Sequence, residues 1–277
     1  MQFDVLRDPD RIAARRAELQ EEWAERHGTR GALVSYMMPT LPLVCPRLHA
    51  SIMGSAHRER YLGIHYFVQT KDRHIRQLIP APEYYKFALN AIADERYSLN
   101  LTQSRLSEVM AAIQNQWALT REIRASTGQS SFWVADQVYR LKAEIASALF
   151  FARSLLDMFS TLSHFLYSPT SRLFSSFTDY AKHITRPTAE NPSDPAMREY
   201  ILKQMDWFWS LRDFRDFVTH HSSIRIEFYE RDGLIETYLQ HVVRPEELIG
   251  STVAGIQAFL DFADDHFTPQ FVERAQT

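Results

Sequence analysis

Glycine is scarce in this chain, and that scarcity limits the folds it can adopt. Only 8 of the 277 residues are Gly. Gly supplies most of the unusual backbone conformations that tight turns require, so a chain poor in Gly has few places to reverse direction sharply. The sequence therefore favours a small number of long helices. Hydrophobic residues make up 45% of the chain, which is ample for a core, and the length suits one large domain or a domain with a sizeable extension.

Four long segments carry apolar residues at helical spacing, and they predict a four-helix bundle. They are residues 100–125, 130–167, 196–221 and 245–267. The second is apolar on most of its faces, as expected for a helix in the centre of a bundle. Between the third and fourth, two β-rich runs flank Asp232-Gly233, a strong hairpin signal. The expected fold is mainly α: a bundle with an inserted β-hairpin.

The first part of the chain has a different character, and we place a domain boundary after it. An Asp-Pro pair at 8–9 opens a helix that runs to Gly28 and is charged on nearly all its surface. Residues 61–70 alternate like a strand, and a further helix starts after Pro80 and Pro82. We expect residues 1–98 to be an α-rich N-terminal extension of unknown role, and residues 99–277 to form the helical bundle.

Composition and motifs exclude several classes of site. Cys45 is the only cysteine, so neither an internal disulfide nor a cysteine-based zinc site can form. The 11 histidines include no HxxxH or HExxH pattern, and no glycine-rich phosphate loop is present. We therefore predict no metal and no cofactor. A Ser-His-Asp triad needs no sequence proximity, so a hydrolase with such a triad remains an alternative, although no GxSxG elbow supports it.

Charge and hydropathy point to a protein of the cytoplasm without a membrane segment. The N-terminus is charged and lacks the apolar core of a signal peptide. No apolar run reaches the roughly 20 residues that span a bilayer, since Arg153 and Asp157 interrupt the longest candidate. The net charge of −3 excludes a protein that coats nucleic acid through bulk charge. Any contact with nucleic acid must be local.

One short stretch, RDFVTHH at 215–221, stands out at the end of the third long helix. Arg215 and His220 form an Arg-x4-His pair, Asp216 follows the arginine directly, and His221 follows the histidine. Mostly apolar helical segments precede and follow this helix. The arrangement resembles the HEPN superfamily (higher eukaryotes and prokaryotes nucleotide-binding domains), whose signature is Arg-x4–6-His in a four-helix bundle. The resemblance covers roughly residues 130–266.

The HEPN resemblance implies a dimeric endoribonuclease that works without metal. His220 would act as general base on a ribose 2′-hydroxyl or as acid for the leaving oxygen, with His221 as a possible substitute. Arg215 would stabilise charge on the phosphorane. The product would be a 2′,3′-cyclic phosphate, so DNA would not be cut. Toxin or defence roles, RNA or nucleotide as ligand, a homodimer and an antitoxin or regulatory partner are all implied by the same resemblance.

The spacing of the two motif residues sets a geometric condition. Five residues along a straight helix separate Arg215 and His220 by about 140° around its axis. Either the helix ends near Thr219, or the two residues face a broad cleft that another chain completes. Asp216 and His220 are four residues apart and can pair on one face, which would fix the imidazole tautomer.

Other residues leave alternatives open. Arg153 and Asp157 are spaced as a structural ion pair, whereas in the functional alternative Glu144 or Asp157 lines the cleft and orients Arg215. The charged end of the third helix can also be read as surface ion pairs with histidines favoured by the helix dipole. The competing function is a non-catalytic HEPN-like scaffold that binds a nucleotide or a protein.

Overall fold

A computed structural model describes most of the chain, which divides into two compact units, residues 1–40 and 41–277. In the first unit the structure describes six residues, all helical and exposed: Ala14, Ala17, Glu18, Glu21, Glu22 and Glu25. In the second it describes residues 43–54, 64–69, 74–79, 81–128, 134–167, 174, 176–186, 194–220 and 223–276. Only the backbone is described for 52–54, 64–69, 74–79, 81–87, 135, 161–167, 220 and 271–276.

The described part of residues 41–277 is mainly helical, as the sequence predicts. Its helices are α2 (Pro46–Gly54), α3 (Ala81–Thr127), α4 (Ala135–Tyr167), α5 (Phe177–Thr185), α6 (Pro195–Gln204), α7 (Asp206–His220) and α8 (Pro245–Gln276). Its strands are β1 (Ile64–Gln69), β2 (His74–Ile79), β3 (Ile226–Arg231) and β4 (Leu234–Leu239), which pair as two antiparallel hairpins. The second helix expected before residue 100 and the expected strand correspond to the start of α3 and to β1. Of the helix expected over residues 8–28, the structure describes only the six helical residues named above.

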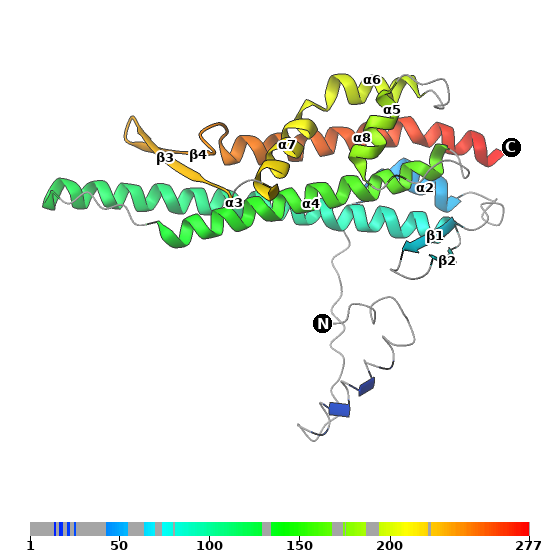
Figure 1. The fold of residues 1–277 in the computed structure, drawn as a ribbon, viewed down its shortest axis with the longest axis horizontal. Helices are drawn as coiled ribbons and strands as arrows, with labels where there is room; N and C mark the ends of the chain where they lie inside the picture. Colours follow the sequence, from blue (N-terminus) through cyan, green and yellow to red (C-terminus); the bar gives the residue numbers. More distant parts are fainter. Residues whose placement is uncertain are drawn as a thin grey trace. The chain divides into compact units, whose positions relative to one another are not determined.

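Three long helices form the centre of this unit. The helices α3 and α4 pack along each other in opposite directions, and α8 contacts both (Figure 1). The helix α7 packs on α8, while the short helices α5 and α6 contact each other beside α4, α7 and α8. The short helix α2 packs on α8. There the carboxylate of Asp264, a residue of α8, accepts the backbone N–H groups of Arg47 and Leu48 at 3.2 and 2.8 Å.

Two long helices differ in continuity from the sequence prediction. The helix α3 runs without a break across residue 98, the position of the expected domain boundary, because it contains no Gly and its only Pro, Pro82, lies in the first turn. The single helix expected over 196–221 is divided into α6 and α7 at Met205, whose φ of −113° and ψ of 29° leave the helical region. Met205 is fully buried, so the bend serves packing.

The predicted hairpin is confirmed at β3 and β4. Asp232 and Gly233 both adopt positive φ, 52° and 80°, as a type I′ turn requires. The hairpin is fixed to α3 by the Gln114 amide, which accepts the backbone N–H of Ile235 at 3.1 Å and donates to its carbonyl. Arg121 adds a hydrogen bond of 2.9 Å to the carbonyl of Gly233.

An aromatic cluster joins the helices that surround the candidate site. Phe159 of α4 and Phe177 of α5 each meet Phe259 of α8, with ring centroids 4.6 and 5.3 Å apart. Phe177 also meets Phe208 of α7 edge to face at 5.0 Å. All four rings are buried. Edge-to-face contacts of this kind stabilise a core beyond simple area burial, so they fix where α5 begins relative to α4 and α7.

Candidate functional site

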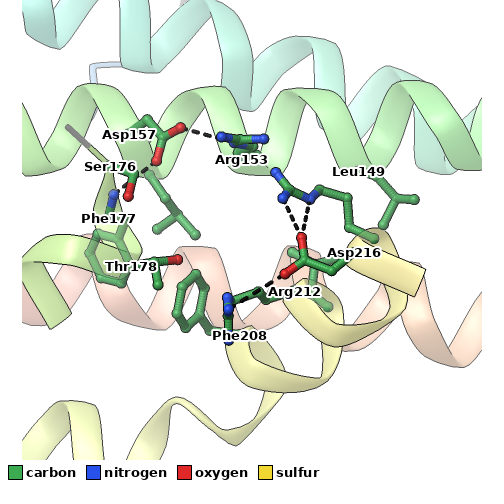
Figure 2. Close-up of a pocket in the computed structure, with 12 residues that line it drawn as sticks. Leu149, Arg153, Asp157, Ser176, Phe177, Thr178, Phe208, Arg212 and Asp216 are labelled. Atoms are coloured by element: carbon green, nitrogen blue, oxygen red, sulfur yellow. Dashed lines mark hydrogen bonds and ion pairs between the residues drawn. The ribbon is translucent and has the colours of Figure 1, made fainter. Parts of the chain in front are cut away.

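A pocket of about 220 Å³ opens between α4, the first turn of α5 and α7. We call it the arginine pocket, because three arginines line it together with two aspartates (Figure 2). Its lining residues are Leu149, Arg153, Leu156, Asp157, Ser176, Phe177, Thr178, Phe208, Leu211, Arg212, Arg215 and Asp216. The leucines and phenylalanines give it an apolar floor, and the charged residues come from α4 and α7.

The α4 side of the pocket is organised by Asp157. One oxygen of its carboxylate accepts from Nε of Arg153 at 3.1 Å, one helical turn earlier, and the other accepts the backbone N–H of Phe177 at 2.8 Å. Phe177 is the first residue of α5, and Ser176 caps the N-terminus of this helix, since its hydroxyl accepts the N–H of Asp179 at 3.2 Å. Asp157 therefore fixes both the arginine and the start of α5 (Figure 2).

The α7 side is organised by Asp216. One of its oxygens accepts from Nε of Arg215 at 3.0 Å and also from Nη2 of the same arginine. Its other oxygen lies 3.5 Å from Nη2 of Arg212, four residues earlier. The side chains of all three residues are about one quarter to one third exposed, so these pairs sit at the pocket mouth and not in the core.

Several donors in the pocket remain unused among the described residues. Arg153 engages only its Nε, and Arg215 leaves Nη1 without a hydrogen bond. The backbone N–H of Thr178, at the first turn of α5, likewise has no hydrogen bond within the described part. The lining carries three guanidinium groups and two carboxylates, and Asp213, outside the lining, lies 3.7 Å from Nη1 of Arg212. The N-terminus of α5 adds a partial positive charge, so the pocket favours an anion.

Of the predicted site residues, Arg215, Asp216 and Asp157 come together in the arginine pocket. Asp157 does not contact Arg215 directly; its oxygens hold Arg153 and Phe177, while Asp216 orients Arg215. The Arg153–Asp157 pair therefore exists and also lines the cavity. Glu144 is half-buried on α4 and does not line the pocket.

The histidines of the motif cannot be placed in the same way. The helix α7 ends at His220, one residue after Thr219, and contains both motif positions, so positions 215 and 220 lie about 140° apart around its axis. Both oxygens of Asp216 already face arginines. The side chain of His220 and the whole of His221 lie outside the described residues, so the expected pairing of Asp216 with His220 stays a prediction.

Two parts of the pocket are absent from the sequence prediction: the start of α5, and Arg212 as a lining residue. A signal for α5 exists, because Ser176-Phe-Thr-Asp179 follows the Ser-x-x-acid pattern of a helix N-terminus. Arg212 lies one turn before Asp216, which predicts their ion pair but not a shared cavity with α4. The cavity depends on tertiary packing, which local spacing does not encode.

Comparison with known proteins found no matching family model, no matching curated protein and no matching solved structure. Within the described residues, no helix combines the length and the apolar character that crossing a membrane requires. The same part of the chain contains no group of three or more His, Cys, Asp or Glu side chains placed to hold a metal ion. A functional interpretation therefore rests on the geometry of the arginine pocket.

Proposed function

We propose that the arginine pocket binds a phosphate group of a nucleotide or of RNA. The observation that carries this proposal is the convergence of Arg153, Arg212 and Arg215 on one concave site, where some guanidinium donors have no partner among the described residues. A guanidinium presents its donors as a planar fork that matches two oxygens of a phosphate, and fixed arginines lose little freedom on binding. Asp157 and Asp216 supply that fixation.

The size and lining of the pocket support a small part of a ligand. A volume of about 220 Å³ equals roughly seven water molecules in the liquid, at about 30 Å³ each. That space accommodates a phosphate with part of its sugar, and it excludes a double helix. The apolar floor of Leu149, Leu156 and Leu211 would contact the carbon skeleton of the ligand. A nucleotide or a single-stranded RNA segment therefore fits better than duplex nucleic acid.

Binding is tested by titrating the protein with AMP and with a short single-stranded RNA in a calorimeter. Arg153→Gln and Arg215→Gln should each weaken binding about tenfold or more, because a hydrogen bond to a charged group contributes about 1.5–3 kcal/mol. Arg198→Gln, at an exposed arginine on α6 outside the pocket, is the matched control and should bind like the wild type. Equal affinity in all three variants would exclude the pocket as the site.

A second candidate function is RNA cleavage at the same pocket, supported by the position of Arg215. This residue belongs to the HEPN-like motif and lines the cavity, where it would stabilise negative charge on the phosphorane. His220 would take the 2′-hydroxyl proton or protonate the leaving oxygen. The homodimer and the antitoxin or regulatory partner that the HEPN resemblance implies belong to this proposal, as does a toxin or defence role.

Cleavage is tested with RNA in EDTA, using the wild type, Arg215→Ala, His220→Ala and His221→Ala. We expect the wild type to produce 2′,3′-cyclic phosphate ends and to leave DNA of the same sequence intact. Arg215→Ala and His220→Ala should abolish the products. Cleavage by His221→Ala at the wild-type rate would assign the catalytic role to His220 and not to His221. If AMP binds as proposed but RNA stays whole, the chain is a nucleotide-binding scaffold. Equal cleavage by the wild type, Arg215→Ala and His220→Ala would reject the nuclease.

A further inference from the structure

A second cluster of chemically active side chains lies on the β3–β4 hairpin. Side chains alternate between the two faces of a strand, so Glu227, Tyr229 and Arg231 share one face of β3. The register pairs Tyr229 with Glu236 and Glu227 with Tyr238, which adds two β4 residues to that face. The opposite face carries the buried residues of β4. A hollow of about 380 Å³ lies against the face that carries Tyr229. It is lined by Tyr229, Glu230, Arg231, Glu236, Tyr238 and His241.

His241 is held over this face by an unusual backbone. Gln240 and His241 both have positive φ, 54° and 60°, a conformation that costs about 1–2 kcal/mol for an ordinary residue. The backbone N–H of His241 donates to Oε2 of Glu227 at 3.0 Å. This bond and the left-handed turn place the imidazole between the carboxylate of Glu227 and the hydroxyl of Tyr229.

The three side chains form a connected series. Nδ1 of His241 shares a hydrogen bond of 2.8 Å with the Tyr229 hydroxyl, and Nε2 lies 3.2 Å from Oε1 of Glu227. In the tautomer with its proton on Nε2, the side that faces Glu227, Nδ1 is left to accept the hydroxyl proton of Tyr229. A nucleophile, a base and an orienting carboxylate therefore stand in sequence, which is the geometric logic of a catalytic triad.

We propose that Tyr229 is a nucleophile, activated by His241 and Glu227, that accepts the acyl group of a small ester. The phenolic oxygen of Tyr229 attacks the carbonyl carbon while its proton moves to Nδ1 of His241. The carbon–oxygen bond to the alcohol then breaks, and the departing alkoxide takes the proton from His241. Water releases the acid from the acyl-tyrosine by the same steps, so the net reaction is ester hydrolysis and needs no oxidant or metal.

Two neighbouring charges fit this chemistry. Oε1 of Glu227 is buried and forms an ion pair with Arg225, whose Nε lies 2.8 Å away. The contact lacks the angle of a hydrogen bond, so Oε1 accepts none among the described residues. In the proposed step, the negative charge of Glu227 would lie beside the imidazolium that forms when His241 takes the proton of Tyr229. Arg231, two residues beyond Tyr229 on the same face, borders the hollow and is paired only loosely with Glu236, at 3.6 Å. Its guanidinium would stabilise the oxyanion.

The test uses p-nitrophenyl acetate as the probe, with the full chain. We expect a burst of p-nitrophenolate and an acetyl group on Tyr229, located by peptide mass spectrometry. Tyr229→Phe removes only the hydroxyl and should eliminate the burst. His241→Asn keeps a residue that tolerates positive φ and should slow acylation about a hundredfold, the usual size of general-base catalysis. Glu227→Gln should slow it less, because the base remains in place.

The matched control is Tyr139→Phe, which alters another exposed tyrosine on α4. It should behave as the wild type, and circular dichroism melting curves confirm that each variant is folded. The proposal is overturned if Tyr229→Phe retains the burst, if only lysines carry the acetyl group, or if His241→Asn acylates Tyr229 at the wild-type rate. In each of these results the contacts among Glu227, His241 and Tyr229 would serve only to fix the turn after β4.

Discussion

The carboxylate of Asp157 accepts the backbone N–H of Phe177 at 2.8 Å, which ties the middle of α4 to the first turn of α5. Because the same carboxylate holds Nε of Arg153 at 3.1 Å, one side chain links the helix N-terminus to the arginine pocket. A carboxylate at the start of α5 also occupies a place that suits a phosphate oxygen. Asp157 therefore both builds the pocket and offsets its positive charge.

Two substitutions separate these roles of Asp157. Asp157→Ala leaves the N–H of Phe177 without its acceptor and should lower the free energy of unfolding by about 1–3 kcal/mol, measured by urea denaturation. Asp157→Asn keeps an oxygen for that N–H and removes the negative charge, so it should be more stable than Asp157→Ala and bind AMP several-fold more tightly than the wild type. Weaker AMP binding by a stable Asn variant would contradict the proposed charge balance.

The close contact between Gly255 of α8 and Trp207 of α7 predicts that Gly→Ala substitutions at Gly255 and at Gly250 have opposite effects on stability. A Cβ atom at Gly255 would lie 2.4 Å from the Trp207 ring, whereas at Gly250 the nearest atom is 3.9 Å away. Gly250→Ala should stabilise the helix by up to about 1 kcal/mol. Gly255→Ala should destabilise the protein by about 1–3 kcal/mol, because a rigid ring must move. Thermal melting of the two variants compares them, and equal shifts would contradict the close packing.

The turn at Asp232-Gly233 predicts the effect of a side chain where the backbone is left-handed. Gly233 has a φ of +80° and its Cβ would meet the Arg121 guanidinium, while Gly128 has a φ of +73° with nothing near. Gly128→Ala therefore reports backbone strain alone, about 1–2 kcal/mol. Gly233→Ala should cost at least as much, because Arg121 must also move away from the turn. A Gly233→Ala variant as stable as the wild type would contradict the type I′ turn.

Burial raises the pKa of the Cys45 thiol to about 12, with Asp264 and Asp261 adding to the effect. A thiol that ionises less readily when folded stabilises the native state at pH values below its unfolded pKa. That contribution is lost as the pH rises from about 9 toward 12. We expect Cys45→Ala to lose less stability than the wild type between pH 9 and 11. In the native protein at pH 8, Cys45 should react with iodoacetamide far more slowly than in urea.

Local sequence signals predicted those elements whose chemistry is local. The Asp232-Gly233 turn was predictable because few residue pairs tolerate two successive positive φ angles. The long helices followed from apolar spacing. The bend at Met205 was not predictable, because no Pro or Gly marks it and the buried position of the Met205 side chain depends on tertiary packing. The short helix α5 had only its Ser-x-x-Asp start as a signal.

The candidate site was predictable in part: the sequence singled out Arg215 and Asp216 of α7 and Asp157 of α4, but not Arg212 or the start of α5 as lining residues. Arg215 and Asp216 are adjacent in the chain, so a motif could identify them. Their meeting with Arg153 and Asp157 depends on how α4 and α7 each pack on α8, and sequence spacing carries no information on that arrangement. The hairpin cluster was equally hidden, since Tyr229 and His241 are twelve residues apart and meet only through the strand register and a left-handed turn.

The unbroken course of α3 limits where this protein can gain or lose residues. Near its beginning, Glu95 accepts a hydrogen bond of 2.8 Å from Ser154 of α4, and nineteen residues later Gln114 holds Ile235 of the hairpin. One residue inserted between these points would turn one contact by about 100° relative to the other. We therefore expect insertions and deletions in related chains to lie in the connections outside α3, and not between Glu95 and Gln114.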